Sequence, residues 1–315
     1  MSLKAVILDD YQNVALKMAD WSVLDGRVDI TVFNDHLSDA EELIERLMPF
    51  DVVCVMRERA PLTREIIERL PNLKMIASTG LENASIDLDA AATYGIEVVH
   101  TGYSSTPTIE FTWTLILAMA RNIGLENYSL RQGGWQVSVG EELAGKTLGL
   151  LGLGRVGSAV GIIGRAFGMN VVAWSQNLTP ERALASGVQL VSKEALFNTA
   201  DFLSIHVRLS PRTHHLVGQA ELAQMKPTSR LINTSRGPIV DQAALLKSLT
   251  SGQIAGAAVD VYDVEPLGNP HPLRELPNVL ATPHIAYVTE GLYRTFYGDT
   301  VRNIVHWVEK KNGPY

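Results

Sequence analysis

The chain has 315 residues, of which 46% are hydrophobic and 19% charged, and its formal net charge is −7. This length suits two domains, and no cluster of Lys or Arg offers a surface for nucleic acid or an anionic membrane. A single cysteine, Cys54, excludes an intrachain disulfide and favours a reducing compartment. Cys54 lies in an apolar strand pattern, so it is expected to be a small buried side chain rather than a nucleophile. The N-terminus shows no signal-peptide pattern, and the apolar helix core near 113–120 is too short to cross a bilayer. We therefore expect a cytoplasmic protein.

The first hundred residues alternate between strand and helix patterns. Strands are predicted over 4–8, 28–33, 51–56, 73–78 and 96–99, and helices over 38–47, 64–70 and 87–95. Ser38 and Glu41 have the spacing of a capping box at the start of the first of these helices. Short loops between alternating strands and helices predict a parallel sheet covered on both faces. This segment is expected to be a domain of its own.

A second strand–helix alternation begins at Thr147. A loop over 101–107 and a long apolar helix over 109–121 are expected to connect the two domains, and 131–135 is expected to be a surface loop. Strands are predicted over 147–151, 171–174, 202–206, 231–234, 255–259 and 279–281, with a helix over 241–249. The last stretch, 289–310, is expected to form one amphipathic helix that packs back on the first domain. The predicted fold class is α/β with two doubly wound parallel sheets, in domains of residues 1–103 with 287–315, and 104–286.

The glycine-rich segment 152–157 follows a strand and opens a helix, which is the context in which G-x-G-x-x-G indicates dinucleotide binding. Gly152 permits the tight turn, Gly154 lets the backbone approach a pyrophosphate, and Gly157 allows the helix to pack closely on its strand. Arg155 and Val156 complete the turn at the helix N-terminus, which attracts anions.

Polar motifs follow the later strands at the edge where open parallel sheets bind ligands. They are Leu203-Ser-Ile-His-Val207, Asn233-Thr-Ser-Arg-Gly237, Asp260 to Pro266 and Thr282-Pro-His-Ile285. Together with the glycine turn, their order and spacing resemble the D-isomer-specific 2-hydroxyacid dehydrogenase family across nearly the whole chain. The resemblance implies a Rossmann dinucleotide-binding domain inserted into a flavodoxin-like substrate domain, hydride transfer between a nicotinamide and a small 2-hydroxy or 2-oxo acid, and a homodimer.

The resemblance also implies a catalytic set of Arg236, Glu265 and His284. Hydride transfer to or from a carbinol carbon requires a proton to move at the oxygen, and histidine is the natural acid–base because its pKa lies near neutral pH. Glu265 would hydrogen-bond the other ring nitrogen of His284 and fix its tautomer. Arg236 would bind the substrate carboxylate and polarise the carbonyl through its forked donors.

Further cofactor contacts follow from the resemblance. Asp260 would accept a hydrogen bond from the nicotinamide carboxamide, Thr234 would supply backbone nearby, and His206 would line the cofactor site, with Thr213 a weaker candidate. Ser175 stands where the family often has an Asp that binds the adenosine ribose. A carboxylate there would repel the NADP 2′-phosphate, whereas Ser175 does not. Residues 174–177 contain no arginine that could bind this phosphate, and Arg182 is the nearest. The choice between NAD and NADP therefore stays open, with a slight lean to NADP tolerance. No metal is required, and His214 and His215 are expected to face solvent.

The segment 79–83 departs from the family pattern, because Leu81 and Glu82 occupy the loop whose N–H groups receive the substrate carboxylate. Arg57 and Arg59, after the strand over 51–56, either face the same site or form a solvated pair beside Glu58. The substrate-binding candidates are Arg57, Leu81 and Glu82.

Three relatives remain as rival interpretations. Metal-independent formate dehydrogenase uses a glutamine where this chain has Glu265, which argues against it. A phosphoglycerate dehydrogenase remains possible, although no regulatory module is expected after residue 315. An NAD-sensing binding protein, like the C-terminal-binding-protein corepressors, would retain the same three residues.

Overall fold

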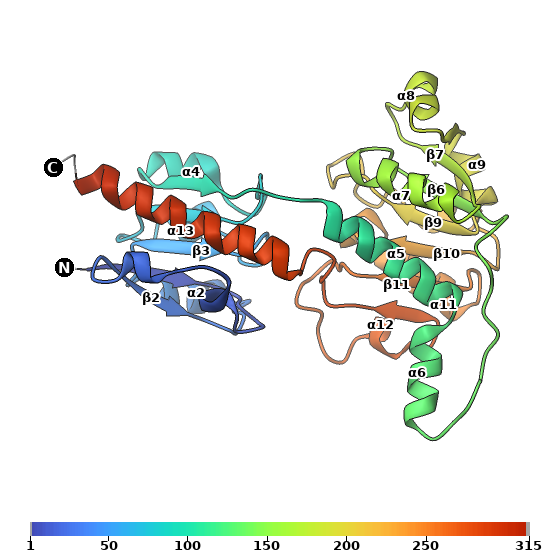
Figure 1. Cartoon of the computed structure of the whole chain (residues 1–315), viewed down its shortest axis with the longest axis horizontal. Coiled ribbons are helices and arrows are strands. Elements are labelled where there is room, and N and C mark those ends of the chain that lie inside the picture. The colour runs from blue at the N-terminus through green and yellow to red at the C-terminus, as the bar shows by residue number, and fades with distance from the viewer. Residues whose placement is uncertain (1, 313–315) are drawn as a thin grey trace. The chain divides into compact units, whose positions relative to one another are not determined.

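The structure is a computed structural model that describes residues 2–312. The chain forms two compact units (Figure 1). Unit 1 contains the residues up to Ser104 and those from Val288 onward, and unit 2 runs from Ser105 to Tyr287. Unit 2 is therefore an insertion between two segments of unit 1. No helix in the described residues 2–312 is long and apolar enough to cross a membrane.

Unit 1 is built on a five-stranded parallel sheet in the order β2-β1-β3-β4-β5. The strands are β1 (Leu3–Ile7), β2 (Val28–Val32), β3 (Val52–Val55), β4 (Met75–Ser78) and β5 (Glu97–His100). Every residue of β3 and β4 is buried, as expected for central strands covered on both faces. This strand order is that of flavodoxin-like sheets, in which ligands bind past the carboxyl ends of the strands.

Short helices and one long helix cover this sheet. They are α1 (Ala15–Met18), α2 (Ala40–Leu47), α3 (Arg64–Ile67), α4 (Leu88–Thr93), α13 (Glu290–Asn312) and the 3-10 turn η1 (Ser22–Leu24). The capping prediction for α2 was wrong by one residue. The Asp39 carboxylate, rather than the Ser38 hydroxyl, accepts from the Glu41 and Glu42 N–H groups, because it can take two N–H bonds and complements the positive helix end.

Cys54 is buried in β3 with 5% of its surface exposed. Burial raises the pKa of its thiol to about 12, because a thiolate would lose its hydration there. The thiolate is the nucleophilic form, so Cys54 is a packing residue, as the sequence predicts.

Unit 2 is built on a seven-stranded parallel sheet in the order β12-β11-β10-β9-β6-β7-β8. The strands are β6 (Thr147–Leu151), β7 (Asn170–Trp174), β8 (Gln189–Leu190), β9 (Phe202–Ile205), β10 (Arg230–Asn233), β11 (Gly256–Val259) and β12 (Val279–Ala281). Counted from β6, the first six strands have the Rossmann order 3-2-1-4-5-6, and β12 adds one more at the edge. The predicted α/β fold with two doubly wound sheets is confirmed.

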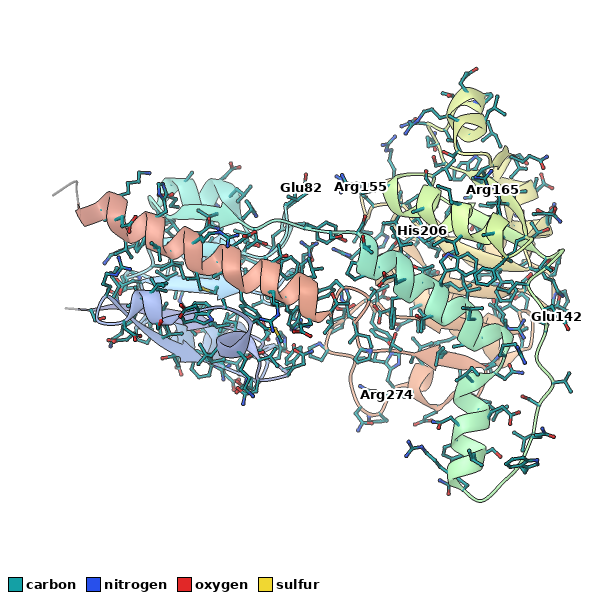
Figure 2. The ribbon with its side chains drawn as sticks, viewed as in Figure 1. Glu82, Glu142, Arg155, Arg165, His206 and Arg274 are labelled. Atoms are coloured by element: carbon teal, nitrogen blue, oxygen red, sulfur yellow. The ribbon has the colours of Figure 1, made fainter. Side chains whose placement is uncertain are left out.

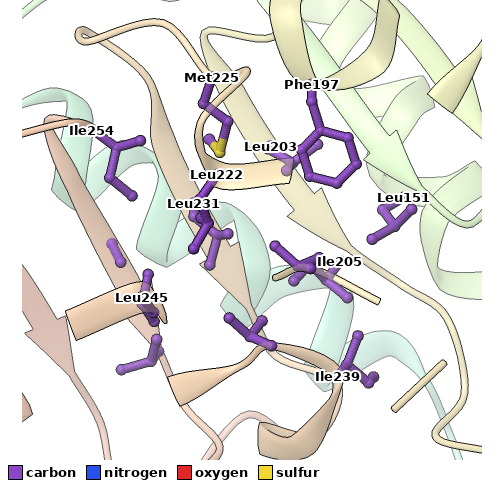
Figure 3. Packing of buried hydrophobic residues seen from close by; sticks show 14 of the residues in the cluster. Leu151, Phe197, Leu203, Ile205, Leu222, Met225, Leu231, Ile239, Leu245 and Ile254 are labelled. Carbon is purple, nitrogen blue, oxygen red and sulfur yellow. The ribbon is translucent and has the colours of Figure 1, made fainter. Parts of the chain in front are cut away.

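Helices lie on both faces of the unit 2 sheet (Figure 1). The helices of unit 2 are α5 (Thr106–Ala120), α6 (Ile123–Arg131), α7 (Arg155–Ala166), α8 (Pro180–Ala185), α9 (Lys193–Thr199), α10 (Gln219–Leu222), α11 (Gln242–Thr250), α12 (Pro272–Glu275) and the 3-10 turn η2 (Gly237–Ile239), and α6 extends away from the sheet. One face packs Leu203, Leu231 and Phe197 at 0% exposure into a continuous core (Figure 3). On the other face, a Cβ on Gly164 of α7 would lie 2.8 Å from the Leu148 Cδ2 of β6, so glycine lets α7 lie close to β6 without displacing this side chain.

Candidate active site

The turn between β6 and α7 is built from glycines with distinct geometries. Gly152 has φ +104°, and a Cβ there would lie 2.8 Å from the carbonyl carbon and oxygen of His206. A Cβ on Gly157 would overlap the Gly152 carbonyl oxygen. Gly154, the N-cap of α7, has φ −86°, and its Cβ would meet nothing within 4 Å. Gly152 and Gly157 are thus required by the turn itself, whereas Gly154 leaves open space at the helix N-terminus.

This contrast predicts opposite results for two alanine substitutions. Gly152→Ala is expected to lower the free energy of unfolding by about 2–5 kcal/mol, because it adds a left-handed backbone penalty to a backbone overlap. Gly154→Ala is the matched control and should leave the stability within about 0.5 kcal/mol while weakening dinucleotide binding. Urea denaturation of both variants measures the difference, and equal stability losses would contradict the assigned geometries.

Two further candidates lie around this turn. Trp174 ends β7, and its carbonyl accepts the Gly152 N–H at 2.8 Å, so the residue that follows, Ser175, lies beside the glycine turn. Arg155 is exposed in the first turn of α7 and lies at the same edge of unit 2 as His206 (Figure 2). Arg182 is exposed on α8, within the segment that follows β7.

His206 follows β9 and has a strongly perturbed titration. Its Nε2 lies 2.9 Å from the Ser204 hydroxyl oxygen. Burial lowers the pKa of His206 to about 4, because the charged ring would lose its hydration. His206 is therefore neutral near pH 7 and adds no positive charge to this edge of the sheet.

Thr213 and the neighbouring histidines belong to the loop after His206. The Thr213 hydroxyl donates to the Arg208 carbonyl at 2.6 Å and accepts from the Ser210 N–H at 2.8 Å, so it already stabilises its own loop. His214 and His215 are exposed and stack at 4.0 Å between ring centroids, which confirms that they face solvent.

The loop after β10 carries Arg236. Asn233 holds this loop at both ends, because its amide donates to the Arg236 carbonyl at 3.0 Å and its Oδ1 accepts the Ser235 N–H at 3.0 Å. The Arg236 Nη1 donates to the Ser235 carbonyl at 2.7 Å. A Cβ on Gly237 would overlap the Tyr262 backbone, so this loop packs directly on the loop after β11. Thr234 is 7% exposed, and its hydroxyl lies 3.0 Å from that of Thr112 on α5.

Glu265 and His284 form a close pair. The Glu265 Oε2 lies 2.5 Å from the His284 Nδ1, and the side chains are 30% and 22% exposed. The other carboxylate oxygen, Oε1, accepts the Tyr262 N–H at 2.9 Å, so both ends of the carboxylate are fixed. A carboxylate in this position selects the tautomer with hydrogen on Nδ1 and leaves Nε2 as the atom that can exchange a proton.

Asp260 organises the loop that carries His284. It is 0% exposed, and it accepts the Thr282 hydroxyl at 2.6 Å, the Ile285 N–H at 2.9 Å and the Ala286 N–H at 2.8 Å. Burial raises the pKa of this carboxyl, against the lowering effect of these hydrogen bonds. Asp260 thus stabilises the His284 loop, a structural part that no sequence pattern indicated beside the cofactor contact implied by the resemblance.

Tyr262 is a site residue that the sequence analysis did not single out. Its hydroxyl donates to the Thr282 carbonyl at 2.8 Å, and its backbone N–H binds Glu265. Burial raises the pKa of its phenol to about 12, so it remains a neutral donor. Through Tyr262, the loops after β10, β11 and β12 form one connected network that holds Arg236, Glu265 and His284.

In unit 1, the candidate substrate residues belong to the loops after β3 and β4. Leu81 is 56% exposed and Glu82 is also exposed, whereas Arg57 lies against the backbone of the loop that carries them. The Gly80 N–H donates to the Thr101 hydroxyl at 2.8 Å. The Arg59 Nη1 donates instead to the Asp9 carbonyl at 2.7 Å, and its guanidinium lies over the Tyr11 ring.

A Rossmann unit with a glycine turn, inserted into a flavodoxin-like unit and carrying a Glu–His pair past its last strands, defines a dinucleotide-dependent oxidoreductase of the two-domain class. A sequence model described as D-isomer specific 2-hydroxyacid dehydrogenase, NAD binding domain, matches residues 113–286. The chain belongs to the D-isomer specific 2-hydroxyacid dehydrogenase family and is a dinucleotide-dependent oxidoreductase.

Several relatives are similar over most of their length. A glyoxylate reductase of Aeropyrum pernix is 39% identical over 260 residues, which cover 79% of this chain and 78% of the relative. A hydroxypyruvate reductase of Thermotoga maritima is 37% identical over 277 residues, which cover 86% and 89%. A crystal structure of a putative D-3-phosphoglycerate dehydrogenase from Ralstonia solanacearum has a TM-score of 0.92 and 36% identity, and covers 99% of this chain and 96% of that one. By contrast, the match to a D-3-phosphoglycerate dehydrogenase of Methanocaldococcus jannaschii spans 48% of that relative's length.

Proposed function

We propose that the protein catalyses reversible hydride transfer between a nicotinamide dinucleotide and a small D-2-hydroxy acid or 2-oxo acid. The observation that carries this proposal is the 2.5 Å contact between Glu265 and His284. In the reducing direction, the His284 Nε2 gives a proton to the carbonyl oxygen as it becomes a hydroxyl, and in the oxidising direction it takes that proton back. Glu265 keeps the ring oriented and holds the hydrogen on Nδ1.

Arg236 supplies the positive charge of the site. Its guanidinium binds the substrate carboxylate and draws electron density from the carbonyl oxygen, because forked N–H donors match the geometry of a planar carboxylate. The bonds that Asn233 makes within the Arg236 loop support this role, since they order the backbone before substrate arrives.

The residues of unit 2 fit a dinucleotide. The open space beside Gly154 and the N-terminus of the 12-residue helix α7 suit a pyrophosphate, with Arg155 and Val156 in its first turn. Ser175 would meet the adenosine ribose, and His206, Thr213, Thr234 and Asp260 would line the remainder. When bound, the nicotinamide supplies or accepts the hydride. Asp260 would accept a hydrogen bond from the nicotinamide carboxamide with the carboxylate lone pairs that its contacts within the loop leave free.

Within unit 1, the loop of Leu81 and Glu82 is proposed as the substrate-binding element, with backbone N–H groups that can donate to a carboxylate. Because the Gly80 N–H already binds Thr101, the receiving N–H groups begin at Leu81. Arg57 is placed to shape this loop.

A turnover assay over a panel of 2-oxo acids tests the proposal. We expect oxidation of reduced dinucleotide with glyoxylate, hydroxypyruvate or a longer 2-oxo acid, because the relatives named glyoxylate reductase and hydroxypyruvate reductase share 37–39% identity with this chain. Tight dinucleotide binding without turnover of any member of the panel would favour a nucleotide-sensing protein instead.

The same panel, run with NADH and NADPH, decides the cofactor. With Ser175 in place of a carboxylate, the 2′-phosphate meets no like charge there, so kcat/KM with NADPH is expected to lie within about tenfold of that with NADH. Ser175→Asp should then raise the preference for NADH. A strong NADH preference in the wild-type protein would contradict the expected tolerance.

A homodimer through unit 2 is proposed as the working assembly. The helix α6 has no buried residue, and the following segment exposes Trp135 by 76% and Val139 by 95%. The Glu126 carboxylate accepts the Ser138 N–H at 2.7 Å, so this segment is tied to α6. An exposed apolar surface of this kind is typical of a protein–protein interface. It lies at the lower end of unit 2 in Figure 1.

A further inference from the structure

We propose that Arg57 is a positioning residue whose guanidinium holds the loop Thr79–Asn83 in the conformation that receives the substrate carboxylate. The inference rests on the proposed function, because it assigns a role in building the carboxylate site of that reaction. It replaces the simpler idea that Arg57 binds the substrate directly.

The Arg57 backbone is held in an uncommon conformation. Its φ is +51°, in the left-handed region that non-glycine residues seldom occupy. Its N–H donates to the Thr79 Oγ1 at 2.8 Å, which ties the end of β3 to the end of β4. This conformation turns the Arg57 side chain toward the β4 loop.

The guanidinium itself binds the loop from one side. Nη1 donates to the Thr79 carbonyl at 3.1 Å and approaches the Glu82 carbonyl at 3.5 Å. Nη2 lies 3.4 Å from the Glu58 Oε1, and the Arg57 side chain is 16% exposed. A guanidinium that contacts the carbonyls at both ends of a tight loop fixes the distance between these carbonyls. A lysine ammonium has a different donor geometry and does not reproduce this contact.

Gly80 is the residue that makes this arrangement possible. It has φ +89°, and a Cβ there would occupy the position of the Arg57 Nη1. The guanidinium therefore fills the space that a side chain at position 80 would take. Glycine at this position serves two purposes, namely the backbone conformation and the room for Arg57.

Asn83 closes the loop from the other end. Its amide donates to the Arg57 carbonyl at 2.7 Å and to the Ser78 hydroxyl at 3.0 Å, and its Oδ1 accepts the Ser85 N–H at 2.9 Å. Asn83 is 6% exposed, so these bonds are shielded from water. Arg57 and Asn83 together hold both ends of a loop whose tip, Leu81, is exposed.

Substitution of Arg57 separates positioning from direct binding. In Arg57→Lys and Arg57→Ala, the KM for 2-oxo acids is expected to rise about 10- to 100-fold, as for the loss of hydrogen bonds from a charged donor, with a much smaller change in kcat. Because the loop binds the carboxylate common to all these substrates, the rise should be similar for glyoxylate, pyruvate and a 2-oxo dicarboxylate. Dinucleotide affinity, measured by fluorescence titration, should stay within about twofold.

Gly80→Ala and added guanidinium ion give an independent test. Guanidinium chloride, kept well below denaturing concentrations, should partly restore the KM of Arg57→Ala, because the free ion can occupy the vacated space. It should not restore Gly80→Ala, in which the new methyl group fills that space. In a double-mutant cycle, the two substitutions should be clearly non-additive, since both disrupt the same contact. The exposed Arg69, which pairs with Glu41, provides the matched control. The KM of Arg69→Ala, with and without guanidinium, should match that of the wild-type protein.

Hydrogen exchange at 79–86 tests the inference without turnover. The amides of this segment should exchange faster in Arg57→Lys and Arg57→Ala than in the wild-type protein, and guanidinium should slow them again in Arg57→Ala. A wild-type protein without turnover would refute the proposed function, and the exchange result would still decide the role of Arg57. Unchanged exchange and KM, or a KM rise confined to substrates with a second anionic group, would overturn the positioning role. The Lys variant keeps the charge and serves if the Ala variant does not fold.

Discussion

Replacement of His284 is expected to lower kcat by about 10²–10⁴-fold, the contribution typical of a positioned general acid–base. His284→Asn is the more informative variant, because His284 has φ +51° and asparagine tolerates this left-handed conformation better than alanine. His284→Ala should give a similar or greater loss. Dinucleotide affinity should stay close to that of the wild-type protein, since the glycine turn between β6 and α7 is unchanged.

Steady-state kinetics with a fixed 2-oxo acid, paired with fluorescence titration of the dinucleotide, measures both quantities. His306 is exposed on α13, and His306→Asn serves as the control that should keep full activity. Turnover that survives in His284→Asn would show that another group moves the proton. The kcat of Glu265→Gln should lie between those of the wild-type protein and His284→Asn. An amide oxygen can still accept the Nδ1 hydrogen of His284, but it carries no charge.

Asp260→Asn is expected to reduce kcat/KM by about 10- to 100-fold, although Asp260 need not touch the substrate. Its carboxylate accepts bonds from Thr282, Ile285 and Ala286 on both sides of His284. An asparagine amide has one accepting oxygen, so at least one of these donors would face an NH₂ group. Catalytic groups displaced by about 1 Å can lose about 10²-fold in rate. The free energy of unfolding should fall by about 1–3 kcal/mol, the cost of an unsatisfied buried donor.

Thr282→Val is the matched control for this experiment. It removes one of the donors to Asp260 and leaves the carboxylate and both backbone contacts, so its effect on kcat/KM should be clearly smaller. Urea denaturation measures the free energy of unfolding of both variants, so that a loss of stability can be distinguished from a loss of kcat/KM. An Asp260→Asn protein with wild-type kcat/KM would show that the His284 loop holds its geometry without the carboxylate.

All strands of both sheets except β8 could be predicted from sequence, because parallel strands are continuous apolar runs between turn signals. β12 was predicted over 279–281 and is found there, and β3 and β4 differ from their predicted ranges only at the ends. The helix α6 was not predicted, because it buries no residue and its apolar residues are spread around the helix rather than gathered on one side by helical periodicity. β8, with two residues, is shorter than any pattern that alternation can identify.

The candidate site shows a similar division. The spacing of Arg236, Glu265 and His284 along the chain could be recognised, since each follows the end of a strand. The tie between Asp260 and the His284 loop joins residues 22–26 positions apart, and the contact of Arg57 with the 79–82 loop joins residues 22–25 apart. Such contacts depend on loop conformations after neighbouring strands, and local sequence preferences do not determine them.

The insertion of unit 2 into unit 1 has a consequence for biosynthesis. The helix α13 packs against α1 and β4 of unit 1, yet the ribosome makes it only after the whole of unit 2. Unit 2 is contiguous and can fold as soon as Tyr287 has emerged, whereas unit 1 must wait for its last helix. At roughly 5–20 residues per second, synthesis of the inserted segment leaves the β1–β5 sheet without α13 for roughly 10–40 s. A chain that ends at Tyr287 and has left the ribosome should therefore contain a folded unit 2 and an incomplete unit 1 that chaperones bind.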